Sequence, residues 1–209
     1  MLSYRHHFHA GNFADCMKHS IYCLLLRALV RKPSPIFVLD THAGAGSYDL
    51  TSTMAQKTRE FEHGIAPLLL QAHPPAAMHP YLEIVRAMNV DQSILKYYPG
   101  SPRIAFSMLR SQDYLALCEL HSTDSGLLRS EFEHVSRVSI RHEDGYQAMR
   151  ALLPPIQRRG MVFIDPAFEI KNEFDRLGDA FKHSYSRWSS GVFAIWFPIR
   201  SSAENQAWL

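Results

Sequence analysis

The chain is 209 residues long, 46% of them hydrophobic and 20% charged, and it carries a formal net charge of +2. A chain of this length and composition can bury one substantial core, and no segment is biased enough to favour disorder. The mildly basic balance falls short of a polybasic nucleic-acid arm, and the longest apolar run, Cys23 to Leu26, is far too short to cross a bilayer.

The first elements in chain order are a capped helix and a short strand. Asn12 is placed to cap a helix in which six apolar residues share one face, namely Phe13, Met17, Ile21, Leu24, Leu25 and Ala28. The run from Ile36 to Asp40 is apolar and ends in an acid, which is typical of a buried parallel strand.

A long interruption follows this strand. Roughly 70 residues separate Asp40 from the next apolar strand pattern at Tyr114, far more than an ordinary loop contains. The stretches 65–72 and 81–88 are amphipathic, and prolines punctuate them. We therefore predict a helical insertion subdomain over residues 51–102.

Strands and helices alternate over the rest of the chain. Further strands are expected at 114–120, 137–140, 161–165 and 192–197, and helices at 127–135, 145–153 and 174–188. This alternation predicts an α/β fold whose open, mostly parallel sheet is covered by helices on both faces, in one domain over residues 1–209.

The first motif with chemical meaning is the run from Asp40 to Gly46, DTHAGAG, at the end of the first strand. Glycines such as Gly44 let the backbone approach a ligand at a strand-to-helix turn, although an ordinary turn looks similar. A dinucleotide site would need a third glycine where Asp49 stands and an acid on a strand about 20 residues on. Glu60 and Glu62 lie in no strand pattern, so NAD is disfavoured.

Two acids follow the next two strands. Glu119 is placed to accept hydrogen bonds from both hydroxyls of a ribose, but it is also an ordinary strand-end acid. Asp144, before Gly145, is placed to accept from the amine of a cofactor adenine, and it is equally suited to cap a helix.

The sequence Asp165-Pro166-Ala167-Phe168 ends the fourth predicted strand of the sheet. An aryl amine is a poor nucleophile, and acceptors aimed at its two N–H groups favour a nitrogen whose lone pair faces a methyl donor. The Asp165 carboxylate and the Pro166 carbonyl are such acceptors, and Asp165 is placed to receive the departing proton. Phe168 offers a stacking face to a flipped base, whereas Asp-Pro alone is also a common turn.

In this order the motifs predict a class I S-adenosylmethionine-dependent methyltransferase, and the chain resembles the RlmJ family of 23S rRNA adenine-N6 methyltransferases nearly end to end. The resemblance is carried by specific stretches: MLSYRH at 1–6, FHAGN at 8–12, LDTHAGAG at 39–46, YYPGSP at 97–102, ELH at 119–121 and LLRSEF at 127–132.

The resemblance implies an enzyme that binds S-adenosyl-L-methionine in a Rossmann-like fold and methylates N6 of a specific adenine in 23S rRNA. It implies cofactor-binding residues at His19, His42, Gly44, Ser101, Glu119, Asp144, Gly145 and Asp165. It also implies catalytic residues at Asp165, Pro166 and Phe168, and RNA contacts from Tyr4, Arg5 and His6. The expected partner is protein-free 23S rRNA or an early assembly intermediate, and the expected form is a cytoplasmic monomer without membrane contact.

Two features depart from the family pattern. Similar family members have Asp-Pro-Pro-Tyr where this chain has Asp165-Pro166-Ala167-Phe168, so Ala167 leaves the catalytic loop less preorganised. Family members also continue past residue 209 with further strands, so we expect a sheet without these C-terminal strands.

Two competing interpretations stay open. Ala167 and the missing strands are compatible with an RNA-binding protein on a catalytically impaired methyltransferase scaffold. The histidines at 6, 7, 9 and 19, with Asp15 nearby, superficially resemble the ligands of a metal-dependent hydrolase. No matching acid cluster follows them, so we predict no metal.

Overall fold

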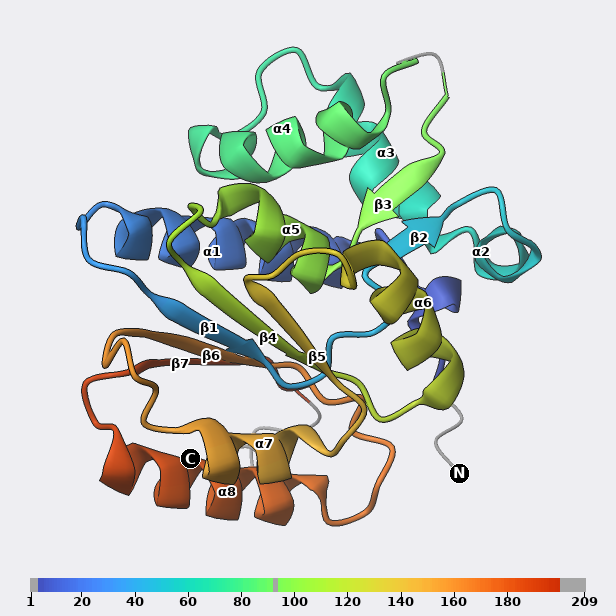
Figure 1. The fold of residues 1–209 in the computed structure, drawn as a ribbon. Helices are drawn as coiled ribbons and strands as arrows, with labels where there is room; N and C mark the ends of the chain where they lie inside the picture. The colour runs from blue at the N-terminus through green and yellow to red at the C-terminus, as the bar shows by residue number, and fades with distance from the viewer. Residues whose placement is uncertain (1–3, 92–93, 200–209) are drawn as a thin grey trace.

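In the computed structural model, which describes residues 4–91 and 94–199, a five-stranded sheet lies between two layers of helices (Figure 1). The strands of this sheet are β1 (Phe37–Asp40), β4 (Tyr114–Cys118), β5 (Val138–Arg141), β6 (Gly160–Ile164) and β7 (Val192–Ile195). Each coincides with one of the five predicted strands to within a few residues, and the predicted α/β class is confirmed.

The strand order is β5-β4-β1-β6-β7, and every neighbouring pair is parallel. From β1 the chain builds outward through β4 to β5, then returns to the other side of β1 for β6 and β7. The order therefore reverses between β1 and β6. Ligands in open α/β sheets bind outside the carboxyl ends of the strands at such a reversal.

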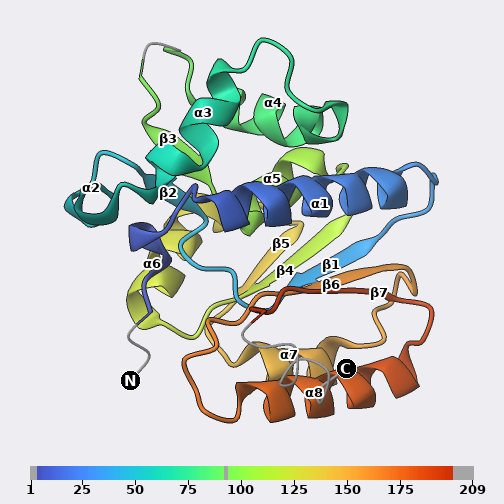
Figure 2. The same cartoon turned by 180° about the vertical axis from the view of Figure 1, so that it is seen from behind.

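Alternate strand residues serve the two faces of the sheet. Val38 and Leu117 belong to the core on the side of α1 (Phe13–Val30) and α5 (Ser101–Met108). Leu39 and Val162 belong to the core under α7 (Gly145–Leu152) and α8 (Glu173–Arg187). The view from behind shows α1 crossing one face and α8 running beneath the other (Figure 2).

Helix α1 has the predicted cap, because the Asn12 side chain accepts from the Asp15 backbone N–H at 2.9 Å. The face that carries the six apolar residues is not the buried side of the helix. Phe13 is 76% and Met17 59% exposed, and Ile21 and Leu24 are exposed as well. The buried side of the helix carries Asp15, Cys16, Lys18, His19, Ser20, Tyr22, Cys23 and Leu26.

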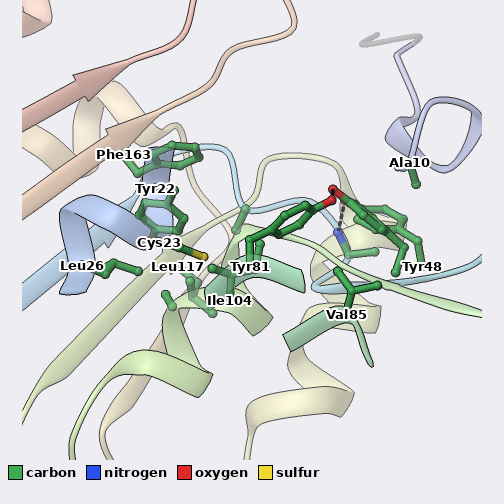
Figure 3. Close-up of a cluster of buried hydrophobic side chains, with 14 of the residues drawn as sticks. Ala10, Tyr22, Cys23, Leu26, Tyr48, Tyr81, Val85, Ile104, Leu117 and Phe163 are labelled. Carbon is green, nitrogen blue, oxygen red and sulfur yellow. Dashed lines mark hydrogen bonds between the residues drawn. The ribbon is translucent and has the colours of Figure 1, made fainter. Parts of the chain in front are cut away.

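The buried side of α1 anchors the larger core cluster. Tyr22 stacks on Phe163 of β6 with ring centroids 4.2 Å apart, and Leu26 and Ile104 fill the space beside them (Figure 3). This packing presses α1 onto the sheet directly above the carboxyl end of β6. The polar residues at its first turns consequently face that end.

The segment between β1 and β4 is mainly helical. A two-stranded antiparallel ribbon, β2 (Ser47–Asp49) with β3 (Tyr97–Pro99), brackets helices and 3-10 turns. These are α2 (Thr53–Thr58), η2 (Glu60–His63), α3 (Ile65–Leu70), η3 (Ala76–Met78) and α4 (His79–Met88). In Figure 1, α3 and α4 lie above α1 and α5, away from the sheet, whereas α2 lies to the right beside β2. The predicted subdomain boundaries at 51 and 102 remain a prediction.

Two remaining elements complete the fold. The 3-10 turn η1 (His6–Phe8) lies before α1, and α6 (Ser122–Phe132) follows β4 and contacts β5. Among the described residues, no helix is both long and apolar enough to cross a membrane.

The orientation of α1 is testable by comparing two truncations. Leu26→Ala removes a fully buried side chain, and we expect the free energy of unfolding to fall by about 2–5 kcal/mol. Met17→Ala removes an exposed side chain, and we expect a change within about 0.5 kcal/mol. Urea unfolding measures both; a larger loss from Met17→Ala would mean that the apolar stripe is the core face.

Candidate active site

A cavity opens at the carboxyl ends of β1, β4 and β6, where the strand order reverses. Nine of the predicted site residues line it, namely Tyr4, His6, His19, His42, Gly44, Ser101, Glu119, Asp165 and Pro166. They come from positions 4 to 166 of the chain, so the parallel sheet brings the motifs of the sequence together.

A second hollow adjoins the first and shares His42, Glu119 and Pro166 with it. Asp144 and Gly145 line this second hollow. Because the two hollows have lining residues in common, we refer to them together as the cleft. The residues after β5 therefore line one part of the cleft, and the N-terminal segment lines the other.

The end of β4 is held by the carboxylate of Glu119. It accepts from the backbone N–H of Gly44 at 2.7 Å and from that of His121 at 2.6 Å. Burial raises the pKa of Glu119. Each carboxylate oxygen keeps a further lone pair, so Glu119 can still accept two hydroxyl groups from the cleft.

Asp144 performs the capping function that the sequence left open. Its Oδ1 accepts from the Tyr146 backbone N–H at 2.8 Å at the start of α7, and its Oδ2 lies 2.5 Å from Arg176 Nη2. Gly145 is required here by close packing, because an added Cβ would lie 2.1 Å from the Thr41 carbonyl oxygen. Arg176, which sequence reasoning missed, also lies over the Tyr146 ring and lines the second hollow.

The two predicted cofactor-binding histidines are uncharged. Burial lowers the pKa of His19 to about 3 and that of His42 to about 4. His19 Nδ1 lies 2.8 Å from the Tyr98 hydroxyl, and His42 Nδ1 lies 2.8 Å from the Thr41 hydroxyl. Both rings are therefore fixed as neutral hydrogen-bonding walls of the cavity.

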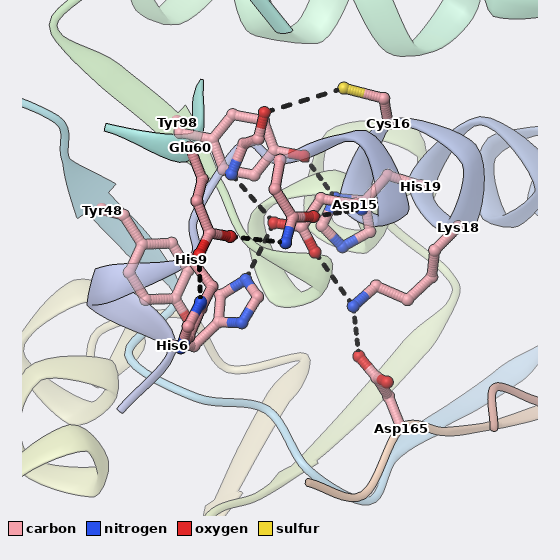
Figure 4. A network of polar contacts seen from close by, with 12 residues as sticks. His6, His9, Asp15, Cys16, Lys18, His19, Tyr48, Glu60, Tyr98 and Asp165 are labelled. Atoms are coloured by element: carbon pink, nitrogen blue, oxygen red, sulfur yellow. Dashed lines mark hydrogen bonds and ion pairs between the residues drawn. The ribbon is translucent and has the colours of Figure 1, made fainter. Parts of the chain in front are cut away.

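The Asp165 carboxylate meets a lysine that the sequence analysis did not select. Lys18 Nζ lies 2.5 Å from Asp165 Oδ2 and 3.0 Å from Asp15 Oδ1 (Figure 4). The Lys18 side chain is 7% exposed, and Asp165 keeps 20% of its side chain exposed. Asp15, Lys18 and His19 stand at helical spacing on one side of α1, and this polar triplet within an apolar helix was the available signal.

The N-terminal segment covers the cavity from the side of η1. The hydroxyl of Tyr4 lies 2.7 Å from His6 Nδ1, and the ring of Tyr4 stacks on that of His9. Arg5 is not among the lining residues of the cavity, and its guanidinium pairs with Asp124 of α6 at 3.0 Å. Of the three predicted RNA contacts, Tyr4 and His6 therefore face the cavity and Arg5 faces α6.

Phe168 is not brought to the cavity. Its side chain is 9% exposed and packs against Phe174, with ring centroids 4.7 Å apart. Its backbone has φ = 52°, an unusual value for a residue other than glycine. The turn after β6 therefore directs the ring into the core under α8, away from Asp165.

The histidines near the N-terminus have separate carboxylate partners. His6 pairs with Asp15, His7 with Asp124 and His9 with Glu60. Within the ranges that the structure describes, no three His, Cys, Asp or Glu side chains are grouped to hold a metal ion.

Comparison with known proteins places these features in a family. Residues 33–209 match the family model described as RsmJ, "Ribosomal RNA large subunit methyltransferase D, RlmJ". Proteins named ribosomal RNA large subunit methyltransferase J are 45% identical in Escherichia coli and 42% identical in Haemophilus influenzae. Each match covers 95% of this chain and 71% of the relative. The crystal structure of protein LPL1258 from Legionella pneumophila matches with a TM-score of 0.89 and 40% identity, over 96% of this chain and 73% of that one.

Asp40 gives the site a measurable pH dependence. This fully buried acid ends β1, and burial raises its pKa to about 7. Between its unfolded pKa of about 3.9 and the folded value, the native state alone retains the proton, so wild-type stability falls as the pH rises. We expect the melting temperature of Asp40→Asn to rise relative to that of the wild type from about pH 4 to about pH 7 and the difference to stay constant at higher pH. A difference that is independent of pH would contradict the raised pKa.

Proposed function

The chain belongs to the RlmJ family of ribosomal RNA large subunit methyltransferases, and from this premise we propose that it transfers a methyl group from S-adenosylmethionine to N6 of an adenine in 23S rRNA. The observation that carries the proposal is the place of Asp165 and Pro166. Both follow β6 and line the same cavity as Glu119 and Tyr4.

The residues of the cleft fit S-adenosylmethionine. Glu119 would hold the ribose hydroxyls, and Asp144 and Gly145 would border the adenine in the second hollow. The remaining predicted cofactor residues, His19, His42, Gly44, Ser101 and Asp165, would surround the methionine part and the methyl group. A buried atom supports the fit: Nδ1 of His121, which lines the cavity, makes no hydrogen bond within the described part of the chain.

The chemistry assigned to the chain is activation of an adenine amine. The cofactor supplies an electrophilic methyl group, and the protein supplies acceptors for the two N–H bonds of the amine. The Asp165 carboxylate and the Pro166 carbonyl would hold the amine with its lone pair toward the methyl group. In the direct in-line transfer the nitrogen–carbon bond would form as the sulfur–methyl bond breaks, and the electron pair of the broken bond would stay on sulfur as a neutral thioether. The amine would lose one proton, which Asp165 is placed to accept.

The RNA would enter from the side of the N-terminal segment, where Tyr4 is 37% exposed. We assign Tyr4 and His6 to contacts with the target nucleotide, and Arg5 to the neighbouring backbone. Stacking of the flipped base on Phe168 requires this ring to leave Phe174, and Ala167 permits that movement because its φ is not fixed by a proline ring.

The direct test is transfer of a labelled methyl group from S-adenosylmethionine to unmodified 23S rRNA, followed by nucleoside analysis. N6-methyladenosine is the expected product. If the protein binds the cofactor but transfers no methyl group, this proposal is refuted. The alternative of an RNA-binding protein on a catalytically impaired methyltransferase scaffold then takes its place.

Asp165→Ala should lower kcat for rRNA methylation at least about 100-fold, because it removes the main acceptor for the amine. The dissociation constant for S-adenosylhomocysteine should stay within about threefold, as the ribose and adenine contacts remain. The matched control is Asp175→Ala, which removes an exposed acid on α8. Activity of the Asp165 variant equal to that of this control would refute the mechanism.

Tyr4→Ala should reduce rRNA methylation at least about tenfold while changing cofactor affinity little, because the ring lies on the substrate side of the cleft. Tyr114→Ala is the control, since Tyr114 is 49% exposed at the opposite edge of the sheet. Titration calorimetry and steady-state methylation measure the two effects. Equal losses in cofactor binding and methylation would remove Tyr4 from the substrate role.

A further inference from the structure

Asp15 is a buried carboxylate for which neither the motifs nor the proposed reaction supplies a purpose. It lies on the first turn of α1, its side chain is 1% exposed, and both oxygens are engaged (Figure 4). Oδ2 accepts from the Gly11 backbone N–H at 2.9 Å and from His6 Nε2 at 2.9 Å. Oδ1 lies 3.0 Å from Lys18 Nζ.

The contacts of Asp15 reach the reacting end of the cavity on two sides. On one side Lys18 continues to Asp165 Oδ2, so two carboxylates share one ammonium group. On the other side His6 continues to the Tyr4 hydroxyl. Asp15 is thus the common partner of the N-terminal segment and of the lysine that contacts the proposed proton acceptor.

The charge state of this cluster follows from burial and pairing. Burial alone would raise the pKa of Asp15, but His6 and Lys18 hold it well below its usual range. Burial alone would lower the pKa of Lys18, but Asp165 and Asp15 raise it. Asp15 is therefore an acceptor only, and the His6 Nε2 that faces it carries a proton.

We propose that Asp15 is a positioning residue for the methyl transfer. Its carboxylate keeps the Lys18 ammonium from pairing with Asp165 alone, and it anchors His6 over the same cavity. The inference rests on the proposed function. Without Asp15, the Lys18 ammonium would have Asp165 as its one carboxylate partner and would compete more strongly with the substrate amine for that carboxylate. His6 and Tyr4 would lose their only buried anchor on α1 among the described contacts.

The experiment compares Asp15→Asn, which keeps the size of the side chain and removes its charge, with Asp113→Asn. Asp113 is a fully buried acid that pairs with Arg110 at the other end of the sheet, so it controls for the loss of a buried carboxylate. We expect Asp15→Asn to lower kcat for rRNA methylation by about tenfold or more, and to leave the Kd for S-adenosylhomocysteine within about threefold. The Asp113 variant should keep the wild-type kcat per folded molecule.

A double-mutant cycle separates positioning from a general loss of structure. Lys18→Met already removes one of the two groups that Asp15 holds. In that background, Asp15→Asn should therefore lower kcat by a smaller factor than it does in the wild type. An equal fold-decrease in kcat in both backgrounds would overturn the inference. A kcat for Asp15→Asn no lower than that of Asp113→Asn would overturn it too. No methylation by the wild type would overturn the proposed function as well.

A measurement on the unmodified protein needs no variant of Asp15 to fold. Nitrogen-15 NMR of the imidazole groups, with the His6 signals assigned from a His6→Gln sample, reports which ring nitrogen carries a proton. We expect His6 Nε2 to be protonated. An unprotonated Nε2 would contradict the contact with Asp15 on which the inference depends.

Discussion

A buried ammonium group shared by two carboxylates constrains the whole arrangement of the site. Lys18 belongs to α1, whereas Asp165 ends β6, so their contact ties the first helix to the strand end that carries the proposed chemistry. Removing one partner from such a group leaves an uncompensated buried charge, which is strongly destabilising. The helix must therefore turn its polar residues toward the cleft. That requirement explains why Phe13 and Met17 remain on the outside.

The parallel sheet supplies the second constraint. The ends of β1, β4 and β6 lie at one edge, and the reversal of strand order between β1 and β6 opens the space into which their loops project. Glu119 illustrates how rigidly this edge is built. By accepting from Gly44 and His121, it joins the loops after β1 and β4 and fixes their relative position.

The sheet and much of the cleft were predictable from the sequence, for a physical reason. Buried parallel strands are short apolar runs, and polar residues directly after them must gather at one edge, as Glu119 and Asp165 do. The face of α1 was not predictable in this way, because periodicity assumes that apolar side chains are the buried ones. Lys18 is buried because it is paired, and its partners lie at distant positions in the chain.

The same limit applies to the loop after β6. The acid and the proline of the motif reach the cavity, but the direction of Phe168 depends on a positive φ and on Phe174, which the motif does not contain. Arg176 was missed for a related reason. It reaches Asp144 from α8, and helical spacing alone does not show which exposed arginine faces a neighbouring helix.

The charges of the cleft bear on which ligand it favours. Glu119, Asp124 and Asp165 line the main cavity; Asp124 is paired with the Arg5 guanidinium and Asp165 with the Lys18 ammonium, while burial keeps His19 and His42 neutral. Under the proposed function, a cavity lined by the Glu119 carboxylate would attract the sulfonium cation of the methyl donor more strongly than the neutral thioether that remains after transfer, because Coulomb interactions are strengthened away from bulk water. Neutral histidines matter for this balance, since imidazolium groups at the same positions would repel the sulfonium. Burial of these rings therefore contributes to the packing of the site and, under the proposed function, would favour the methyl donor over its product.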